Sequence, residues 1–187
     1  TRFVEKHHPD LTARLAPIVS PMIATARALH EEHGEDMRVV FIGPCVAKKL
    51  EASTPGLQGE VDVAITFAEL RRLLFKRRVH QETVQPSDFD PPHPNLGALF
   101  PISRGMLQAA DIQEDLTNGD VVAADGRQEF VEAINEFEEG ALDARLLEVL
   151  CCSGCIMGPG MTCQTPRFRR RAQVSQYVNS RVANYDK

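Results

Sequence analysis

Residues 37–70 have the sequence MRVVFIGPCVAKKLEASTPGLQGEVDVAITFAEL, and this stretch decides the fold. Met37 to Ile42 is a nearly continuous run of apolar, β-branched residues and predicts a buried strand. Val61 to Phe67 predicts a second buried strand, and Thr66 is placed to cap a helix over Ala68 to Arg78. The order strand, loop, strand, helix indicates an α/β sheet.

Helices and strands continue to alternate outside this stretch. The expected elements are a short helix near Asp10 or Thr12 that Pro17 limits, a helix from Ser20-Pro21 to about Gly34, a helical turn over Val46 to Ala52, a short helix after Ser103, a strand over Val121 to Ala124, a helix over Arg127 to Glu139, a strand or helix end over Leu146 to Leu150, and an amphipathic helix over Arg167 to Asp186. Between them, residues 80–98 are rich in proline and predict a long loop or a lobe boundary.

The composition narrows the class of protein. The 187 residues are 43% hydrophobic and 25% charged, so a packed core is feasible. The formal net charge is -5, whereas a general nucleic-acid binder carries a basic excess, so we expect no nucleic-acid partner. No apolar run approaches the roughly 20 residues that a membrane helix needs. The chain begins at Thr1 without a signal-peptide stretch, which we interpret as a lost N-terminal portion.

The five cysteines favour a thiol or metal site. One is Cys45, and the other four lie between Cys151 and Cys163. A secreted disulfide scaffold would be shorter and would usually hold an even number, so we expect a cytoplasmic protein.

Cys152-Ser153-Gly154-Cys155 is a C-x-x-C pair inside a glycine-rich loop. Two thiolates at this spacing can bind one metal centre. Gly154, Gly158 and Gly160 let the backbone approach an inorganic core and direct N–H groups at its sulfides. The pair alone is equally compatible with a redox disulfide, a zinc knuckle or buried thiols without a ligand.

Cys45 follows the first predicted strand directly. Ligands of α/β sheets gather at the carboxyl ends of strands, and Lys48 and Lys49 could balance an anionic thiolate site. The alternative for Cys45 is a small buried side chain that packs beside the sheet.

Several segments, taken together and in order, resemble one known family, the C-terminal domain of the iron-only hydrogenase large subunit. The segments are the proline pattern of residues 9–21, FIGPCVAKKLE at 41–51, VDVAITFAEL at 61–70, FPISRG at 100–105 and EVLCCSGCIMGPG at 148–160. The resemblance implies one domain over residues 1–187, with mixed or parallel sheets in two lobes and a cluster crevice between them.

The resemblance also implies a cofactor, a [4Fe-4S] cubane joined through a cysteine to a two-iron subcluster. By residue match, Cys45, Cys152 and Cys155 are cubane ligands, and Gly154 and Gly158 belong to the cluster-binding loop.

Two further matches concern the two-iron subcluster alone. Lys48 resembles a lysine that contacts a diatomic ligand on that unit, and Glu51 resembles a carboxylate of the proton path. We expect catalytic roles for both only where the subcluster is present.

The chain departs from the family pattern in its cysteines. The first cluster motif is absent, which removes one ligand and the proton-relay thiol. Hydrogen-producing members separate the last two cysteines by three residues. Here Cys152 and Cys155 are separated by two, so Cys151, which has the family spacing to Cys155, is an alternative ligand.

The expected pocket for the two-iron subcluster is degenerate. Gly43 and Leu150 stand where catalytic members have methionines, and Arg104 stands in a turn where they have glycine. We therefore expect a cubane-binding module without hydrogen turnover.

Three functions remain open from the sequence. The first is electron transfer with a redox partner or an attached ferredoxin domain. The second is a redox or hydrogen sensor that reports to an attached signalling domain. The third is a structural zinc or dithiol protein in which Cys163 joins the other three thiols.

The predicted C-terminal helix also carries a basic run. Arg167, Arg169, Arg170 and Arg171 are expected to form either a solvated helix face or a docking face for an acidic redox partner.

Overall fold

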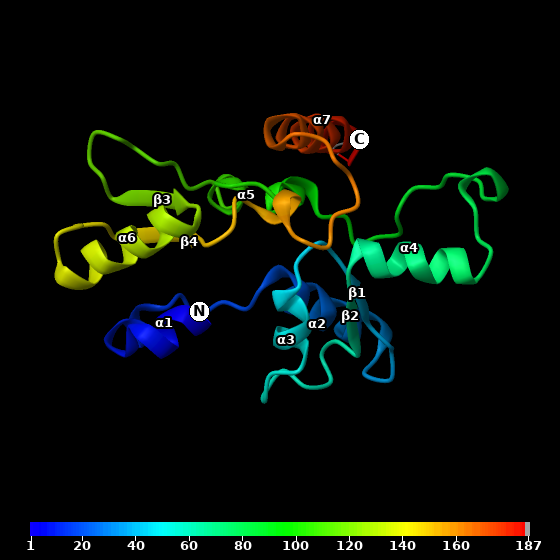
Figure 1. The fold of residues 1–187 in the computed structure, drawn as a ribbon, viewed down its shortest axis with the longest axis horizontal. Helices are drawn as coiled ribbons and strands as arrows, with labels where there is room; N and C mark the ends of the chain where they lie inside the picture. The colour runs from blue at the N-terminus through cyan, green and yellow to red at the C-terminus, as the bar shows by residue number, and fades with distance from the viewer. Residues whose placement is uncertain (186–187) are drawn as a thin grey trace.

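Two small parallel sheets, each with its own helices, organise the chain into two lobes, as a computed structural model that describes residues 1–185 shows (Figure 1). The strands are β1 (Val40–Ile42), β2 (Val63–Ile65), β3 (Val121–Asp125) and β4 (Leu146–Leu150). The α-helices are α1 (Arg2–His7), α2 (Pro21–His33), α3 (Ala47–Ala52), α4 (Phe67–Lys76), α5 (Gly105–Ala109), α6 (Arg127–Glu139) and α7 (Arg167–Tyr185). Four 3-10 helices complete the described chain: η1 (Pro9–Arg14), η2 (Gln81–Thr83), η3 (Asn95–Leu99) and η4 (Cys155–Met157).

In the β1–β2 lobe, two three-residue strands pair in parallel, with Val40 opposite Val63 and Ile42 opposite Ile65. The core beneath them consists of Met22, Ile23 and Ala26 of α2 with Val39, Val61 and the partly buried Phe41. Both strands are shorter than the predicted ranges of residues 37–42 and 61–67.

The prediction that these strands are buried holds for one face of the sheet only: Val39, Val61 and Ala64 are buried. Val40 is 50% exposed and Ile42 is 40% exposed. Successive side chains of a strand point to opposite faces, so α2 covers Val39 and Phe41 while their neighbours face away. A continuous apolar run predicts burial on both faces, whereas this core covers only one face.

In the β3–β4 lobe, five residue pairs lie in parallel register from Val121–Leu146 to Asp125–Leu150. The strand at Leu146–Leu150 settles the choice between strand and helix end, and α6 has the predicted bounds. The first residues of the chain belong to this lobe, because Val4 and Leu11 pack against Phe130 and Ile134 of α6.

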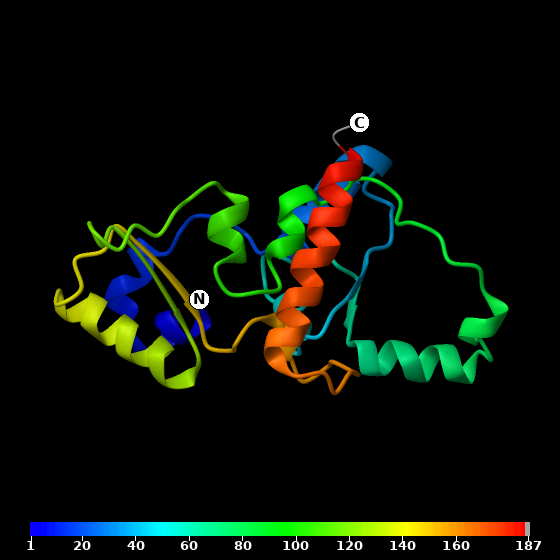
Figure 2. The ribbon, with the colours of Figure 1, turned by 90° about the horizontal axis from the view of Figure 1, so that it is seen from above.

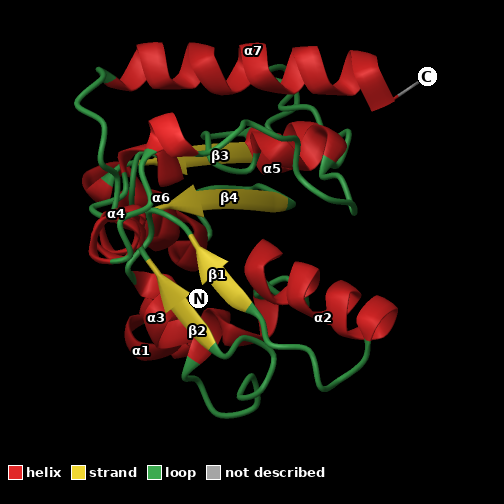
Figure 3. Ribbon diagram, turned by 90° about the vertical axis from the view of Figure 1, so that its right-hand side faces the viewer, coloured by secondary structure: helices red, strands yellow, loops and turns green. Residues whose placement is uncertain are grey.

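The third core lies under α7. Val178 of α7 packs with three residues: Leu99 of η3, Ile156 of η4, and Ile102 in the turn after η3. Figure 3 shows α7 lying across the top of the molecule, above both sheets. The predicted end of this helix, Asp186, lies outside the described residues.

Helix α4 extends from the β1–β2 lobe away from the centre of the molecule, and the loop of residues 80–98 leads the chain back (Figure 2). The lobe boundary expected in that loop stays a prediction. None of the helices among residues 1–185 has the length and apolar character needed to cross a membrane.

The helix starts show which capping predictions hold. Thr66 forms the predicted cap as part of a capping box with Glu69. Ser20 occupies the N-cap of α2, but its hydroxyl makes no capping bond and is buried without a partner. The short helix expected after Ser103 begins at Gly105 with Arg104 as its N-cap, and the Ser103 hydroxyl donates to Asp125. The short helix near Asp10 is the 3-10 helix η1, and α1 was not predicted.

Candidate functional site

Cys45 lies in the turn that follows β1. The amide of Gly43 donates to the carbonyl of Ile65 (3.0 Å), which extends the β1–β2 pairing to the edge of the turn. The amide of Lys48 then donates to the carbonyl of Cys45 (3.3 Å) at the start of α3. The half-buried thiol is thus fixed at the carboxyl end of a parallel strand, where α/β folds bind ligands.

Residues 151–163, which we call the cysteine loop, follow β4. Cys151 and Cys152 are exposed, and Cys155 is half-buried at the start of η4. Gly154 has a φ of 87°, and a Cβ there would lie 2.7 Å from the carbonyl oxygen of Pro101. The amide of Ile156 donates to that same carbonyl (3.3 Å). The C-x-x-C segment therefore packs directly against backbone of residues 101–102.

The cysteine loop also contacts the Cys45 turn. The amide of Gly160 donates to the carbonyl of Pro44 (2.9 Å), and its carbonyl accepts from the amide of Ala68 in α4 (3.2 Å). A Cβ on Gly158 would lie 2.5 Å from the Pro44 oxygen, and a Cβ on Gly160 would lie 2.6 Å from the Thr66 Cβ. These glycines are required because the two segments meet backbone to backbone.

The Cys155 thiol is influenced by the two other cysteines and by Lys48. Burial raises the pKa of the Cys155 thiol above its ordinary value, and the nearby Cys152 and Cys45 raise it further, whereas Lys48 lowers it. The hydrogen bond from Gly160 to Pro44 places the Cys45 turn against the loop that carries Cys152 and Cys155, which is more than 100 residues away in the sequence. The three thiols do not form a closed metal site: within residues 1–185, no group of three or more His, Cys, Asp or Glu side chains could hold a metal ion.

The two lysines after Cys45 have different partners. Lys48 pairs with Glu51 one turn along α3 (2.6 Å), and both side chains are partly buried. Lys49 was expected to balance the charge of the thiols, but it pairs with Glu69 of α4. Lys49 together with the amide and hydroxyl of Thr66 lowers the pKa of Glu69 to about 2.

Cys163 lies at the end of the cysteine loop, next to α7. It lines a hollow between the helices η3 and η4 and helix α7, together with Ala98, Val174 and Tyr177. Its carbonyl accepts a hydrogen bond from the Arg170 guanidinium (2.8 Å).

The basic run of α7 is partly structural. Arg167 pairs with Asp125 of β3 (2.6 Å), and Arg170 donates to backbone carbonyls of the cysteine loop. The predicted solvated or docking face therefore fits only Arg169 and Arg171 of the four arginines, and both of these are exposed.

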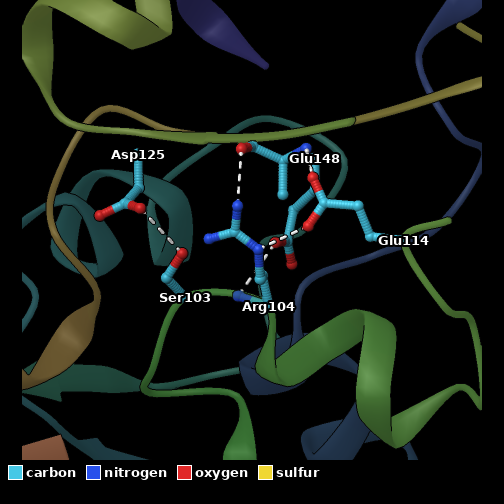
Figure 4. A network of polar contacts seen from close by, with 6 residues as sticks. Ser103, Arg104, Glu114, Asp125 and Glu148 are labelled. Atoms are coloured by element: carbon cyan, nitrogen blue, oxygen red, sulfur yellow. Dashed lines mark hydrogen bonds and ion pairs between the residues drawn. The ribbon is translucent and has the colours of Figure 1, made fainter. Parts of the chain in front are cut away.

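A second polar cluster, which the sequence reasoning missed, lies between the start of α5 and the β3–β4 sheet (Figure 4). The guanidinium of Arg104 donates to Glu114 (2.7 Å), and the backbone amide of Arg104 donates to Glu148 (3.1 Å). Burial raises the pKa of Glu148, while Arg104 acts in the opposite direction. The available signal was a carboxylate at the centre of the apolar strand Leu146–Leu150.

Comparisons with known proteins agree with this fold. Among solved structures, the [FeFe]-hydrogenase HydA(deltaEFG) superposes with a TM-score of 0.66 at 19% identity, over 94% of this chain and 62% of that chain. An apo [FeFe]-hydrogenase HydA1 from Chlamydomonas reinhardtii gives 0.65 at 18% identity, over 94% and 62%. At these identities the likeness shows the fold alone, and the chain spans about three fifths of each of these hydrogenases.

A curated relative is the cytosolic Fe-S cluster assembly factor NAR1 of the yeast Vanderwaltozyma polyspora. It is 38% identical over 77 residues, which are 41% of this chain and 15% of the relative. A family model, described as iron only hydrogenase large subunit, C-terminal domain, matches residues 1–159. The chain therefore belongs to the family formed by the C-terminal domains of iron-only hydrogenase large subunits.

Proposed function

We propose that this domain binds an iron–sulfur cluster of the [4Fe-4S] type through Cys45, Cys152 and Cys155 and passes electrons to a redox partner in the cytoplasm. The observation that carries the proposal is the meeting of the Cys45 turn with the cysteine loop, where Cys45 and Cys152 both act on the Cys155 thiol. Membership of the family and likeness to an Fe-S assembly factor point to the same cofactor chemistry.

The donor set fits such a cluster in its chemistry. Thiolates are the ligands of iron–sulfur cubanes, and a cubane supplies one-electron transfer when bound. Three thiols leave one position of a four-ligand cubane to another donor. Cys152 is exposed, so its side chain is accessible to an incoming cluster, whereas Cys155 is already seated beside Pro101.

The surroundings of Cys155 act in two opposite directions on the loss of its proton. Cys155 must lose its proton to bind iron, and burial opposes this because it raises the pKa of the thiol. Lys48 counteracts that effect and is itself oriented by Glu51. We propose that Lys48 stabilises the thiolate of Cys155. We also propose that the domain retains no two-iron subcluster, because Gly43 and Leu150 stand where catalytic members of the family have methionines.

Anaerobic reconstitution with ferrous iron and sulfide tests the proposal. Iron and sulfide per chain, together with electron paramagnetic resonance after reduction, are measured for the wild type and for Cys45→Ala, Cys155→Ala and Cys163→Ala. We expect both of the first two variants to lose most of the bound iron and Cys163→Ala to match the wild type. Equal losses in all three variants would support a four-thiol site instead, and unchanged iron in Cys45→Ala would exclude Cys45 as a ligand.

A second candidate function is a role in iron–sulfur cluster assembly, with the cluster as cargo. The observation that favours it is the identity shared with the assembly factor NAR1. Exposed Cys151 and Cys152 would then allow a cluster to leave as well as to arrive. Mixing the reconstituted protein with an apo-ferredoxin separates the two: a cargo cluster transfers to the acceptor, whereas a resident electron carrier is retained.

A further inference from the structure

Glu148 is an unusual residue to find at the centre of β4. It is 6% exposed, and its neighbours in the strand are apolar. Its carboxylate accepts a hydrogen bond from the backbone amide of Arg104 (3.1 Å). A buried carboxylate costs free energy unless it is hydrogen-bonded, so its position indicates a specific structural task.

The partner of Glu148 is a strained residue. Arg104 has a φ of 64°, a left-handed conformation that residues other than glycine rarely adopt. Three contacts hold it there: Glu148 on its amide, Glu114 on its Nε atom (2.7 Å), and the Ala123 carbonyl on its guanidinium (3.4 Å). All three partners come from β3, β4 and the segment before β3, so the β3–β4 sheet holds this turn in place (Figure 4).

The turn that Glu148 contacts also packs directly against the cysteine loop. Residues 101–105, the Pro101–Gly105 turn, are closed by the bond from the Gly105 amide to the Ile102 carbonyl (3.0 Å). The Pro101 carbonyl accepts the amide of Ile156, the residue after Cys155, and Ile102 packs against the Ile156 side chain. The left-handed Gly154 lies against the same carbonyl.

We propose that Glu148 is a positioning residue for Cys155: it fixes Arg104, and thereby the Pro101–Gly105 turn against which the cysteine loop is seated. This inference rests on the proposed function in treating Cys155 as a cluster ligand. Strand β4 is thus connected to the cysteine loop in two ways. The chain continues from Leu150 to Cys151, and Glu148 contacts the turn against which the loop packs.

The charges around Glu148 suit this task. Two guanidiniums, those of Arg104 and Arg167, face three carboxylates, those of Glu114, Asp125 and Glu148. The Arg104 side chain bonds to Glu114, so the hydrogen bond of Glu148 is made with the Arg104 backbone amide. An acceptor without charge should therefore replace Glu148, whereas an apolar side chain should not.

The test compares Glu148→Ala and Glu148→Gln in the full polypeptide that contains these residues, with Glu139→Ala as the control at an exposed position of α6. Alkylation of each cysteine by iodoacetamide in metal-free protein is followed by mass spectrometry, and iron content is measured after reconstitution. We expect Glu148→Ala to speed alkylation of Cys155 several-fold while Cys45 stays close to its wild-type rate. Glu148→Gln and Glu139→Ala should behave as the wild type does.

Two results would overturn the inference: an unchanged Cys155 rate in Glu148→Ala, or an equal rise at Cys45 and Cys155, which indicates general loosening. The alkylation readout needs no cluster. A wild type that binds no iron would therefore defeat the proposed function while leaving the positioning of Cys155 testable. Normal iron binding by the wild type with no effect of Glu148→Ala on Cys155 would defeat only the positioning role.

Discussion

The carbonyl of Pro44, the residue before Cys45, accepts a hydrogen bond of 2.9 Å from the amide of Gly160 in the cysteine loop. This bond joins the β1–β2 lobe to the loop that leaves the β3–β4 lobe. Because it is made by backbone groups alone, it holds the Cys45 turn near Cys155 whether or not the thiols have bound anything. The candidate site is in this sense preorganised by the packing of glycines against a turn.

Gly158→Ala should separate the two segments. A Cβ at Gly158 would lie 2.5 Å from the Pro44 oxygen and 2.9 Å from the Pro44 carbonyl carbon, and neither atom belongs to a flexible side chain. We expect a loss of about 1–3 kcal/mol in the free energy of unfolding, the usual cost of overpacking, and a lower iron content after reconstitution. Denaturant unfolding and iron analysis measure these effects.

Gly97→Ala is the matched control for this substitution. Its Cβ would meet the Pro94 Cβ at 3.8 Å, an ordinary contact, so we expect little change in stability and none in iron content. Equal stability and equal iron in the two variants would show that the close approach at Pro44 has no consequence.

Thr66→Ala should weaken the start of α4. The Thr66 hydroxyl accepts from the Glu69 amide (3.2 Å), and the Glu69 carboxylate accepts from the Thr66 amide (2.8 Å), so two amides at the helix start are satisfied. Losing an N-cap of this kind costs about 0.5–2 kcal/mol, which urea unfolding can measure. Thr66→Ser keeps the hydroxyl and should retain most of that stability; a Ser variant as unstable as the Ala variant would point to lost methyl packing against Gly160.

The stability that Glu69 contributes to this cap should depend on pH. The pKa of Glu69 is lowered from its ordinary value of 4.5 to about 2 by Lys49 and Thr66. A lowered folded-state pKa contributes stability above pH 4.5, and that contribution is lost as the pH falls from 4.5 towards 2. Glu69→Gln removes this titration, so the difference in unfolding free energy between wild type and variant should shrink over that interval. A difference that stays constant with pH would mean that Glu69 is not ionised in its cap.

The sequence predicted best those elements whose signals are local. Helix α6 has its predicted bounds because Gly126 and Gly140 mark both ends and apolar residues recur at helical spacing between them. The capping box of α4 likewise depends on residues three positions apart. Helix α1 was missed since its stability comes from a distant partner: the Phe3 ring lies 5.0 Å from the Phe130 ring, and no local pattern reveals that contact.

The candidate site divides in the same way. The roles of Cys45 and the C-x-x-C pair as ligands stay predictions from the family motifs. The glycine-rich loop was expected to direct its amides at the sulfides of a cluster, but the Gly160 amide donates to the Pro44 carbonyl and the Gly158 amide to the Cys155 carbonyl. The role of Glu148 could not be predicted, because it depends on the left-handed backbone of Arg104 and on register between β4 and a turn far away in sequence. Pairings of this kind arise from the tertiary fold rather than from residue spacing.

Arg170→Lys should loosen the end of the cysteine loop. The Arg170 guanidinium donates to the carbonyls of Ile156 (2.6 Å), Thr165 and Cys163 (2.8 Å), and thereby fixes the loop against α7. A lysine ammonium is a compact charge that cannot reproduce this planar fork. Leaving partly buried carbonyls without a donor costs about 1–3 kcal/mol, so the variant should unfold at lower denaturant and expose Cys163 to alkylation. Arg169→Lys, at the exposed neighbouring position, should leave both quantities unchanged. If Arg170→Lys were as stable as Arg169→Lys, with Cys163 equally protected in both, the three carbonyls would not depend on the guanidinium.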